Sequence, residues 1–599
     1  MAQSAEDAEY ERALAALSGL ISGRQRKDSG MWSHAFEMMQ SYLERLGLDK
    51  ELPKLSIIHV AGTKGKGSTC AVIERMLRQA GYRTGLFTSP HLIDVRERIR
   101  INGEPVDRAT FLRNLWWCFD TLEEKATDDS GKPAYFRFLT LLSFKVFLEQ
   151  QVDVVILEVG LGGRLDATNC VRAPVVCGVS SLGFDHMELL GHTLPEIARE
   201  KAGIFKPGVP AFTVPQPEDA LGALRDKAAA VGAPLAVVRP WEGYAGAQGV
   251  ALGLAGEHQK LNAALALALA GTWEGLAGGA AGGGAAAAER AAEVAAGRLP
   301  AVYAAGLAAA SWPGRGQIVH DVVEADSSSG ASAGGGGQAA EPAASEAQQQ
   351  AQRRQHQQQQ HGVPRLSFYL DGAHTAESMA TCAHWFADTI GSPPTAAAAA
   401  AAAAGPAAAG AANGASQQPH EQQQSGLVTQ NVLLFNCMQE REPQKLLAPL
   451  AQTLRERQVS IHHALFVPPD STYMKLGATQ EPINLSWQHA LRSVWEANGG
   501  SSGGGSSGAA GAARAAAAAA PQLPPLPAAC ASGLAVPAGA GARGAVLPSL
   551  QVTLEWLRRC VREAPALRMR VLVTGSLYLV GDLLKQLQQP QGGGGAGSG

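Results

Sequence analysis

The run Ile57-Ile58-His59-Val60-Ala61-Gly62-Thr63-Lys64-Gly65-Lys66-Gly67-Ser68-Thr69 is followed by Cys70 to Arg78. Residues 57–61 are apolar and partly β-branched, which predicts a buried strand. Apolar residues at helical spacing between Cys70 and Arg78 predict a helix. The loop between them contains three glycines and two lysines. The stretch therefore predicts a strand, a glycine-rich loop and a helix in succession.

Such a loop can bind phosphate. Glycines let backbone N–H groups approach a ligand closely, and a helix that begins near Ser68 adds free N–H groups and a positive dipole end. Lys66 would supply a mobile charge. The run departs from the nucleotide pattern G-x-x-x-x-G-K-[ST], because Gly67 separates Lys66 from Ser68. A plain structural turn is the alternative interpretation.

Composition limits the possible functions. The net charge of -3 argues against a general nucleic-acid binder. The eight cysteines include no C-x-x-C pair, which indicates a reducing compartment and no zinc site. No apolar run approaches the ~20 residues of a membrane span, and the acidic N-terminus fits neither a secretory signal nor a transit peptide. We expect a cytoplasmic monomer that binds small molecules, with a mitochondrial or plastid form as an alternative.

Polar residues follow several further predicted strands. Strand 84–88 precedes Ser89, strand 152–157 precedes Glu158, and His186 follows shortly after strand 175–181. Ligands bind at the carboxyl ends of strands in open parallel sheets. Glu158 fits the Walker-B position that holds Mg²⁺, with a turn-capping carboxylate as the alternative. Because His186 follows a strand end as Ser89 and Glu158 do, we interpret it as a metal ligand.

Two helices carry further candidates. A helix with capping-box spacing is predicted over 193–202, and Lys201 lies in its last turn, where a cation would compensate the helix dipole. Tyr135, Phe136 and Arg137 are expected to precede another helix. They are candidates for lining a pocket for a flat ring.

The second half of the chain predicts a smaller parallel α/β sheet. Strands over 366–370, 432–435, 464–467 and 571–574 alternate with helices over 377–390, 444–457 and 549–562. Three low-complexity stretches, 324–362, 392–426 and 498–545, cannot bury enough apolar surface to order themselves, so we expect disordered inserts. The expected domains are 1–305 and 306–599.

A larger set of motifs occurs in order over both domains and outside the inserts. It comprises Gly62–Ser68, Ser89–Leu92, Arg96–Gly103, Tyr135–Thr140, Leu157–Gly160, Ser180–His186, His258–Asn262, Trp312–Gln317, Tyr369–His374 and Val573–Gly581. The set resembles folylpolyglutamate synthases of eukaryotic type, in the Mur ligase superfamily. The resemblance implies an N-terminal P-loop ATPase domain with a parallel sheet and a smaller C-terminal Rossmann-like α/β domain.

The resemblance also implies an activity and a site. The activity is ATP-dependent addition of L-glutamate to the γ-carboxyl group of a (tetrahydro)folate, through an acyl phosphate, by a tetrahydrofolate:L-glutamate γ-ligase that forms ADP. The implied ATP contacts are Gly65, Lys66, Gly67, Ser68, Asn262, Arg315 and Asp371, and the implied Mg²⁺ ligands are Ser89, Glu158 and His186. Lys201 matches a lysine that is carbamylated in some relatives and then acts as an anionic metal ligand. Lys66, Lys201 and His186 are the candidate catalytic residues, Tyr135, Phe136 and Arg137 the candidate folate contacts, and K⁺ a further candidate cofactor.

Two other functions remain open at this stage. A dihydrofolate synthase would perform the same chemistry on dihydropteroate, but Arg96–Gly103 and Tyr135–Thr140 favour the polyglutamating enzyme. A non-enzymatic nucleotide-binding scaffold would use the inserts as interaction arms. Arg315 and Asp371 argue against the scaffold, because a switch needs neither.

Overall fold

The computed structural model describes residues 2–21, 35–126, 132–321, 364–391, 427–470, 484–499 and 543–588. The chain divides into two compact units, Met1–Pro313 and Gly314–Gly599. The inserts expected over 324–362 and 392–426 lie outside the described residues, as does most of 498–545. The predicted insert 498–545 extends too far at its C-terminal end, because Arg543–Val546 form a strand.

The first unit is built around an eight-stranded sheet in the order β4-β3-β2-β5-β1-β6-β7-β8. Its strands are β1 (Ile57–Ala61), β2 (Thr84–Phe87), β3 (Ile99–Ile101), β4 (Glu104–Pro105), β5 (Val154–Glu158), β6 (Val176–Val179), β7 (Ala211–Thr213) and β8 (Leu235–Val237). Its helices are α1 (Ala2–Gly19), α2 (Ala35–Leu46), α3 (Lys66–Gln79), α4 (Arg108–Glu124), α5 (Tyr135–Glu149), α6 (Met187–Leu190), α7 (Leu194–Lys201), α8 (Glu218–Val231), α9 (His258–Trp273), α10 (Gly284–Ala295) and α11 (Ala301–Ala308).

Strands β2, β5, β1, β6, β7 and β8 are parallel, but β3 and β4 add an antiparallel edge. The predicted parallel sheet is therefore confirmed over these six strands, and the antiparallel strands β3 and β4 extend it at one edge. A two-residue turn at Asn102-Gly103, where both residues have positive φ (50° and 81°), joins β3 to β4. Asn-Gly is the strongest short hairpin signal in a sequence, so the pairing of β3 with β4 has a local cause.

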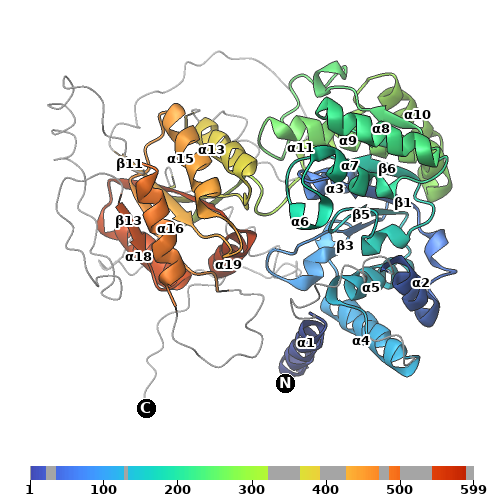
Figure 1. Cartoon of the computed structure of the whole chain (residues 1–599), viewed down its shortest axis with the longest axis horizontal. Helices are drawn as coiled ribbons and strands as arrows, with labels where there is room; N and C mark the ends of the chain where they lie inside the picture. The colour runs from blue at the N-terminus through green and yellow to red at the C-terminus, as the bar shows by residue number, and fades with distance from the viewer. Residues whose placement is uncertain are drawn as a thin grey trace, which may run out of the picture. The chain divides into compact units, whose positions relative to one another are not determined.

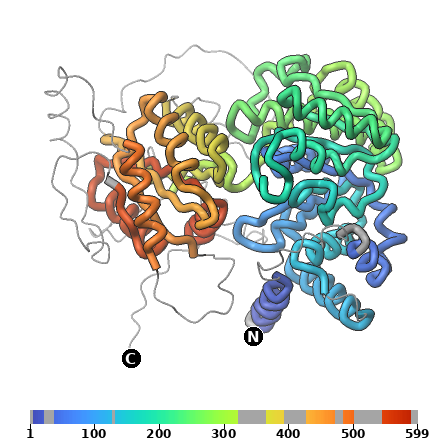
Figure 2. Tube along the Cα trace, viewed as in Figure 1, coloured from blue at the N-terminus to red at the C-terminus, as the bar shows by residue number. Residues whose placement is uncertain are grey.

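Side chains that alternate along β1 enter two different cores. Ile57 packs with apolar residues of α1, α2, α4 and α5 on one face of the sheet. Ile58 and Val60 pack with residues of α3, α9 and α11 on the other face. Figure 1 shows these two helical layers with the sheet between them, and the Cα trace in Figure 2 shows the same layers. The central strand is thus held from both sides, which fixes the position of the loop that follows it.

The second unit contains a six-stranded sheet in the order β13-β12-β11-β14-β10-β9. Its strands are β9 (Gln317–Asp321), β10 (Leu366–Leu370), β11 (Val428–Phe435), β12 (His463–Phe466), β13 (Arg543–Val546) and β14 (Leu567–Thr574), and its helices are α13 (Ala376–Gly391), α15 (Pro443–Glu456), α16 (Ser486–Ala497), α18 (Leu550–Glu563) and α19 (Leu577–Gln588). β9 pairs antiparallel with β10, so this sheet too is parallel except at one edge.

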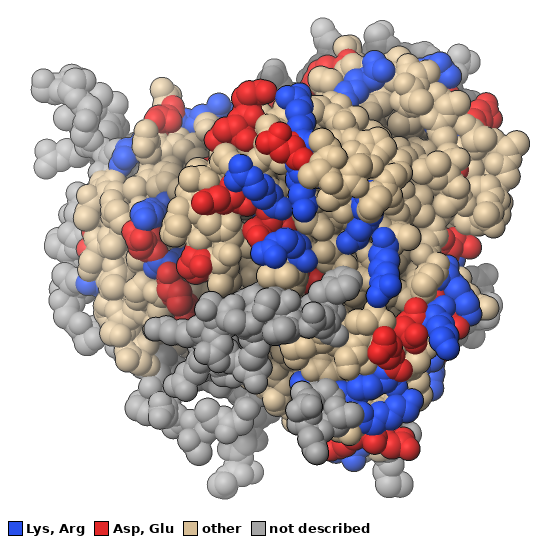
Figure 3. Space-filling model, turned by 45° about the vertical axis from the view of Figure 1, so that its right-hand side comes forward, with Lys and Arg blue, Asp and Glu red and all other residues tan. Residues whose placement is uncertain are grey.

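The surface carries both signs of charge. On the face drawn in Figure 3, Lys and Arg side chains are interspersed with Asp and Glu. Among the described helices, none is both long enough and apolar enough to span a bilayer. The seven cysteines in the described part of the chain are free and buried.

Candidate active site

The loop after β1 is tied to the neighbouring strand end. The N–H groups of Thr63 and Lys64 both donate to the carbonyl oxygen of Ser181 at 3.0 Å, and the Ser180 hydroxyl donates to the Lys64 carbonyl at 2.7 Å. Only a glycine at position 62 allows this close approach, because a β-carbon there would lie 1.9 Å from Ser180 Oγ. The loop is therefore curled and held before α3 begins.

The predicted phosphate ligands lie at the start of α3. Gly65 is the residue before the helix and has φ +81°, a conformation that favours glycine. Lys66, Gly67 and Ser68 form the first turn, so their N–H groups lie among the unpaired donors of the helix N-terminus. The Lys66 amine lies 3.5 Å from the carbonyl oxygen of Thr63. The backbone donors of α3 and the Lys66 amine belong to the same short loop. This arrangement favours the phosphate-binding interpretation of the loop over that of a plain structural turn.

Asn262, near the start of α9, lies against this loop. A β-carbon at Gly65 would lie 2.2 Å from Asn262 Oδ1, and the Thr69 hydroxyl lies 3.4 Å from the same oxygen. The Asn262 amide in turn donates to Gln259 at 2.8 Å. The structure thus brings Asn262 to the predicted phosphate loop from a segment almost two hundred residues away in sequence.

The two oxygen-bearing metal candidates lie together. The Ser89 N–H donates to a carboxylate oxygen of Glu158 at 2.9 Å, and Glu158 is 4% exposed. A β-carbon at Gly67 would lie 3.7 Å from both Glu158 carboxylate oxygens. Glu158 therefore lies beside the phosphate loop, which is where a cation bound to nucleotide phosphates needs an anionic ligand.

His186 is placed less tightly. It lies just before α6 with φ +50°, its side chain is 44% exposed, and its Nε2 lies 3.9 Å from an Asp185 carboxylate oxygen. Within the described residues, no group of three or more His, Cys, Asp or Glu side chains gathers as a metal site. The oxygens of Ser89 and Glu158 nevertheless fit a hard divalent cation, which takes few protein ligands and completes its shell with phosphate and water.

Lys201 is buried, and it does not simply compensate the dipole of α7. Its amine donates to the carbonyl oxygen of Gly62 at 2.8 Å, and the side chain is 4% exposed. Burial and the charge of Lys66 lower the pKa of Lys201 to about 7, against the opposing effect of Asp185 and Asp166. At that pKa, a large share of the Lys201 amine is uncharged near neutral pH, and an uncharged amine is a nucleophile.

Asp166 is a buried carboxylate that influences Lys201 and that sequence reasoning did not identify. It lies close enough to affect Lys201, and burial raises its pKa despite hydrogen bonds from Thr168 and Leu161. The residue lies in the loop after β5, well beyond the strand end. Reasoning from strand ends therefore could not find it.

The candidate folate contacts are in the first turn of α5 and do not precede the helix, which corrects the expectation from sequence. The ring of Phe136 lies over the backbone of Gly160, since a β-carbon there would be 2.4 Å from Phe136 Cζ. Tyr135 lies under the Arg98 guanidinium, with 5.5 Å between Cζ and the ring centroid. Arg137 contacts the sulfur of Met38 at 3.8 Å.

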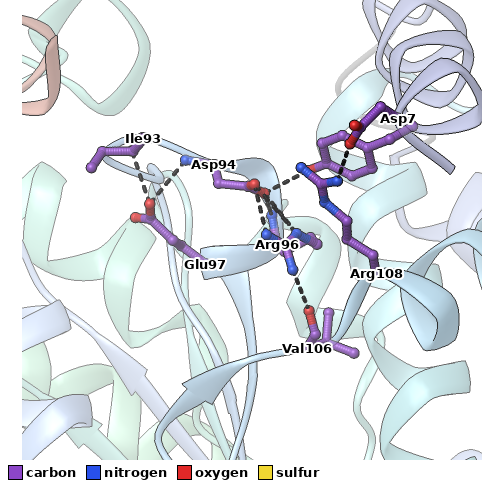
Figure 4. Close-up of polar contacts among 8 residues, drawn as sticks. Asp7, Ile93, Asp94, Arg96, Glu97, Val106 and Arg108 are labelled. Atoms are coloured by element: carbon purple, nitrogen blue, oxygen red, sulfur yellow. Dashed lines mark hydrogen bonds and ion pairs between the residues drawn. The ribbon is translucent and has the colours of Figure 1, made fainter. Parts of the chain in front are cut away.

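The segment after Ser89 is fixed by side chains on the segment itself. Glu97 accepts from the N–H groups of Leu92, Ile93 and Asp94, two of which are drawn in Figure 4. Arg98 donates to Nδ1 of His91 at 2.9 Å. Burial and the charge of Arg98 lower the pKa of His91 to about 3, so its ring is neutral.

In the second unit, Arg315 and Asp371 are neighbours. The N–H of Gly316 donates to an Asp371 carboxylate oxygen at 3.0 Å, and the N–H of Gly372 donates to the Gly314 carbonyl at 3.0 Å. The antiparallel pairing of β9 with β10 causes this, because it places Gln317 opposite Leu370. Two residues far apart in sequence thus share one end of the second sheet.

Comparison with known proteins agrees with this fold. The folylpolyglutamate synthase of Arabidopsis thaliana is 41% identical over 593 residues, which is 97% of this chain and 87% of the relative. The mitochondrial folylpolyglutamate synthase of Homo sapiens is 42% identical over 375 residues, 61% of this chain and 56% of the relative. A bifunctional folylpolyglutamate synthase/dihydrofolate synthase from Yersinia pestis, crystallised with AMPPNP and Mn ion, matches with a TM-score of 0.57 and 22% identity over 96% of this chain and 98% of that one. No protein-family model matches the chain.

The mostly parallel sheet with its glycine-rich loop, followed by a second α/β unit, is the two-domain fold of the Mur ligase type, and the sequence relatives place the chain among ATP-dependent ligases. The identity to the Arabidopsis enzyme extends over nearly the whole chain and narrows the class further. The chain belongs to the folylpolyglutamate synthase family, of eukaryotic type, and is an enzyme. Neither the dihydrofolate synthase nor the scaffold alternative is favoured by the relatives that cover most of the chain.

Proposed function

We propose that this enzyme ligates L-glutamate to folates at the first unit's phosphate loop, with Mg²⁺ as the divalent cation. The observation that supports this most is the position of the buried Glu158 carboxylate beside Gly67. A metal ion held by Ser89, Glu158 and His186 would neutralise charge on the phosphates of ATP. Arg315 and Asp371 are proposed as further ATP contacts.

The chemistry has two steps. A carboxylate does not react with an amine, because oxide would be the leaving group. An oxygen of the folate γ-carboxylate attacks the terminal phosphorus of ATP, the bond to ADP breaks, and an acyl phosphate forms. The glutamate amine then attacks the acyl carbon, loses a proton, and expels inorganic phosphate. The loop amides and Lys66 hold the phosphates in line during the first step.

Two features suit the remaining roles. Tyr135 and Phe136 present aromatic rings close to the loops after β2 and β5, and we assign them to the folate. The neutral amine of Lys201 suits carbamylation, which would place an anion beside the phosphate loop. A requirement for K⁺, a monomeric state and a cytoplasmic location stay predictions.

Release of ADP tests the function. Purified protein with ATP and Mg²⁺ should release ADP only when both a folate and L-glutamate are present, and the product should be the folate extended by one glutamate. Dihydropteroate in place of folate should give little ADP. Folate-independent hydrolysis, or preference for dihydropteroate, would contradict the proposal.

A further inference from the structure

Trp312, at the end of the first unit, lies beside the phosphate loop. A β-carbon at Gly67 would lie 3.3 Å from the indole Nε1 of Trp312, nearer than it would lie to Glu158. Gly67 is in the first turn of α3, where unpaired backbone donors face the predicted phosphates. The indole N–H therefore lies at the edge of the same anion site.

The ring of Trp312 is held in place from its other side. The Arg100 guanidinium lies over it, with 5.2 Å between Cζ and the ring centroid. Arg100 is itself fixed by donating to the carbonyl oxygens of Glu97 and Gly103 at 3.2 and 3.1 Å. The indole also packs against the core formed by α3 and α9. Such support holds a donor in one orientation, as a positioning group requires.

The place of Trp312 in the chain gives this contact a consequence. Trp312 is followed by Pro313, the last residue of the first unit. Arg315, a proposed ATP contact, comes three residues after Trp312. A contact between Trp312 and a bound nucleotide would therefore form at the end of the first unit, two residues before the second unit begins.

We propose that the Trp312 indole N–H donates a hydrogen bond to the terminal phosphoryl group of ATP bound at the phosphate loop, and so distinguishes ATP from ADP. The proposal rests on the proposed function, since it requires a nucleotide at Gly65–Ser68. Tryptophan has only one donor and no acceptor. The indole N–H can therefore bind the additional phosphoryl group of ATP, but it cannot take part in proton transfer.

The test compares two nucleotides in two variants. Trp312→Phe keeps a ring under Arg100 and removes the N–H. It should weaken binding of AMPPCP by about tenfold and leave binding of ADP within about twofold. The matched control is Trp117→Phe, because Trp117 on α4 also lies under a cation, Lys145, and is 37% exposed. That control should bind both nucleotides as the wild type does.

The outcomes separate this inference from the proposed function. Equal weakening for both nucleotides in Trp312→Phe, or none, overturns the inference while wild-type ADP release stands. Wild-type protein that binds neither nucleotide overturns the proposed function. If Trp312→Phe does not fold, indole N–H resonances of ¹⁵N-tryptophan-labelled wild type decide. One resonance should shift with AMPPCP and not with ADP, and an identical pattern for both nucleotides contradicts the proposal.

Discussion

The Lys201 amine lies 2.8 Å from the carbonyl oxygen of Gly62 and ties α7 to the phosphate loop. Burial, and next the charge of Lys66, lower the pKa of Lys201 to about 7. Near neutral pH a large share of this side chain is therefore an uncharged amine. Only that form has the lone pair needed to attack CO₂ and form a carbamate.

Lys201→Arg retains a cation but cannot form a carbamate, because the guanidinium remains protonated. We expect turnover to fall by about 100-fold, the upper range for loss of a group that supports a metal site. Lys206→Arg is the control, since Lys206 is a half-buried lysine that donates to Asn169 at 2.8 Å. It should keep most of the activity in the ADP release assay.

Added bicarbonate provides a second measurement on the wild-type enzyme. After removal of CO₂, it should restore turnover more at pH about 8 than at pH about 6, because the neutral amine predominates only above a pKa of about 7. Wild-type turnover by Lys201→Arg would show that the carbamate is not needed.

Lys66→Ala should reduce ADP release by at least about 1000-fold, since it removes the cation that the phosphate loop itself supplies to the transferred phosphoryl group. Lys64→Ala, two positions earlier in the same loop, should retain most of the turnover. Circular dichroism and thermal unfolding should match the wild type for both variants. Near-normal turnover of Lys66→Ala would remove this residue from the mechanism.

Arg315→Ala should lower kcat by about 100-fold while the Kd for folate changes by less than about threefold. The expected difference follows from its assignment to ATP and from its place beside Asp371, which accepts from the Gly316 N–H. Arg315→Lys should recover only part of the rate, because an ammonium lacks the planar fork of a guanidinium. Fluorescence titration with folate and the ADP assay measure the two quantities separately. A weaker folate Kd with unchanged kcat would place Arg315 at the folate instead.

Local signals in the sequence predicted the elements that form the site. The strand before Gly62, the helix after Gly65 and the capping box of α7 all lie where short-range patterns placed them. The same holds for β10, predicted over 366–370 and observed over those residues. These segments could be predicted because the spacing of apolar residues, the helix caps and the glycines determine local structure within a few residues.

Several misses depended on tertiary contacts, whereas the Asn102-Gly103 hairpin and the start of α5 at Tyr135 depend on local sequence. Asp166 acts on Lys201 only after α7 folds back against the loop that follows β5, where the Arg164 N–H donates to the Glu200 carbonyl at 2.8 Å. Trp312 meets Gly67 across more than two hundred residues of chain. The antiparallel pairing of β9 was equally invisible, because pairing direction depends on the partner strand and not on the segment itself.

The Tyr10 hydroxyl donates to Asp94 at 2.6 Å and joins α1 to the segment after Ser89. Burial alone would raise the pKa of Asp94, but hydrogen bonds from Arg96 and Tyr10 outweigh it and lower the pKa. Tyr10→Phe should destabilise the first unit by about 1–2 kcal/mol, the cost of one charge-assisted hydrogen bond. Urea unfolding, followed at amides of the first unit by hydrogen exchange, measures the loss.

Acid removes this stabilisation in a defined direction. A depressed folded-state pKa means that Asp94 stabilises the fold above its unfolded value of about 4 and ceases to do so as pH falls through the folded value. Asp94→Asn should therefore be less stable than wild type at pH about 7, and the difference should shrink below pH about 4. Asp7→Asn is the control, because its ion pair with Arg108 is 53% exposed on the Asp7 side and should cost at most about 0.5 kcal/mol. A difference between wild type and Asp94→Asn that does not change with pH would mean that the Asp94 charge contributes nothing to the stability of the fold.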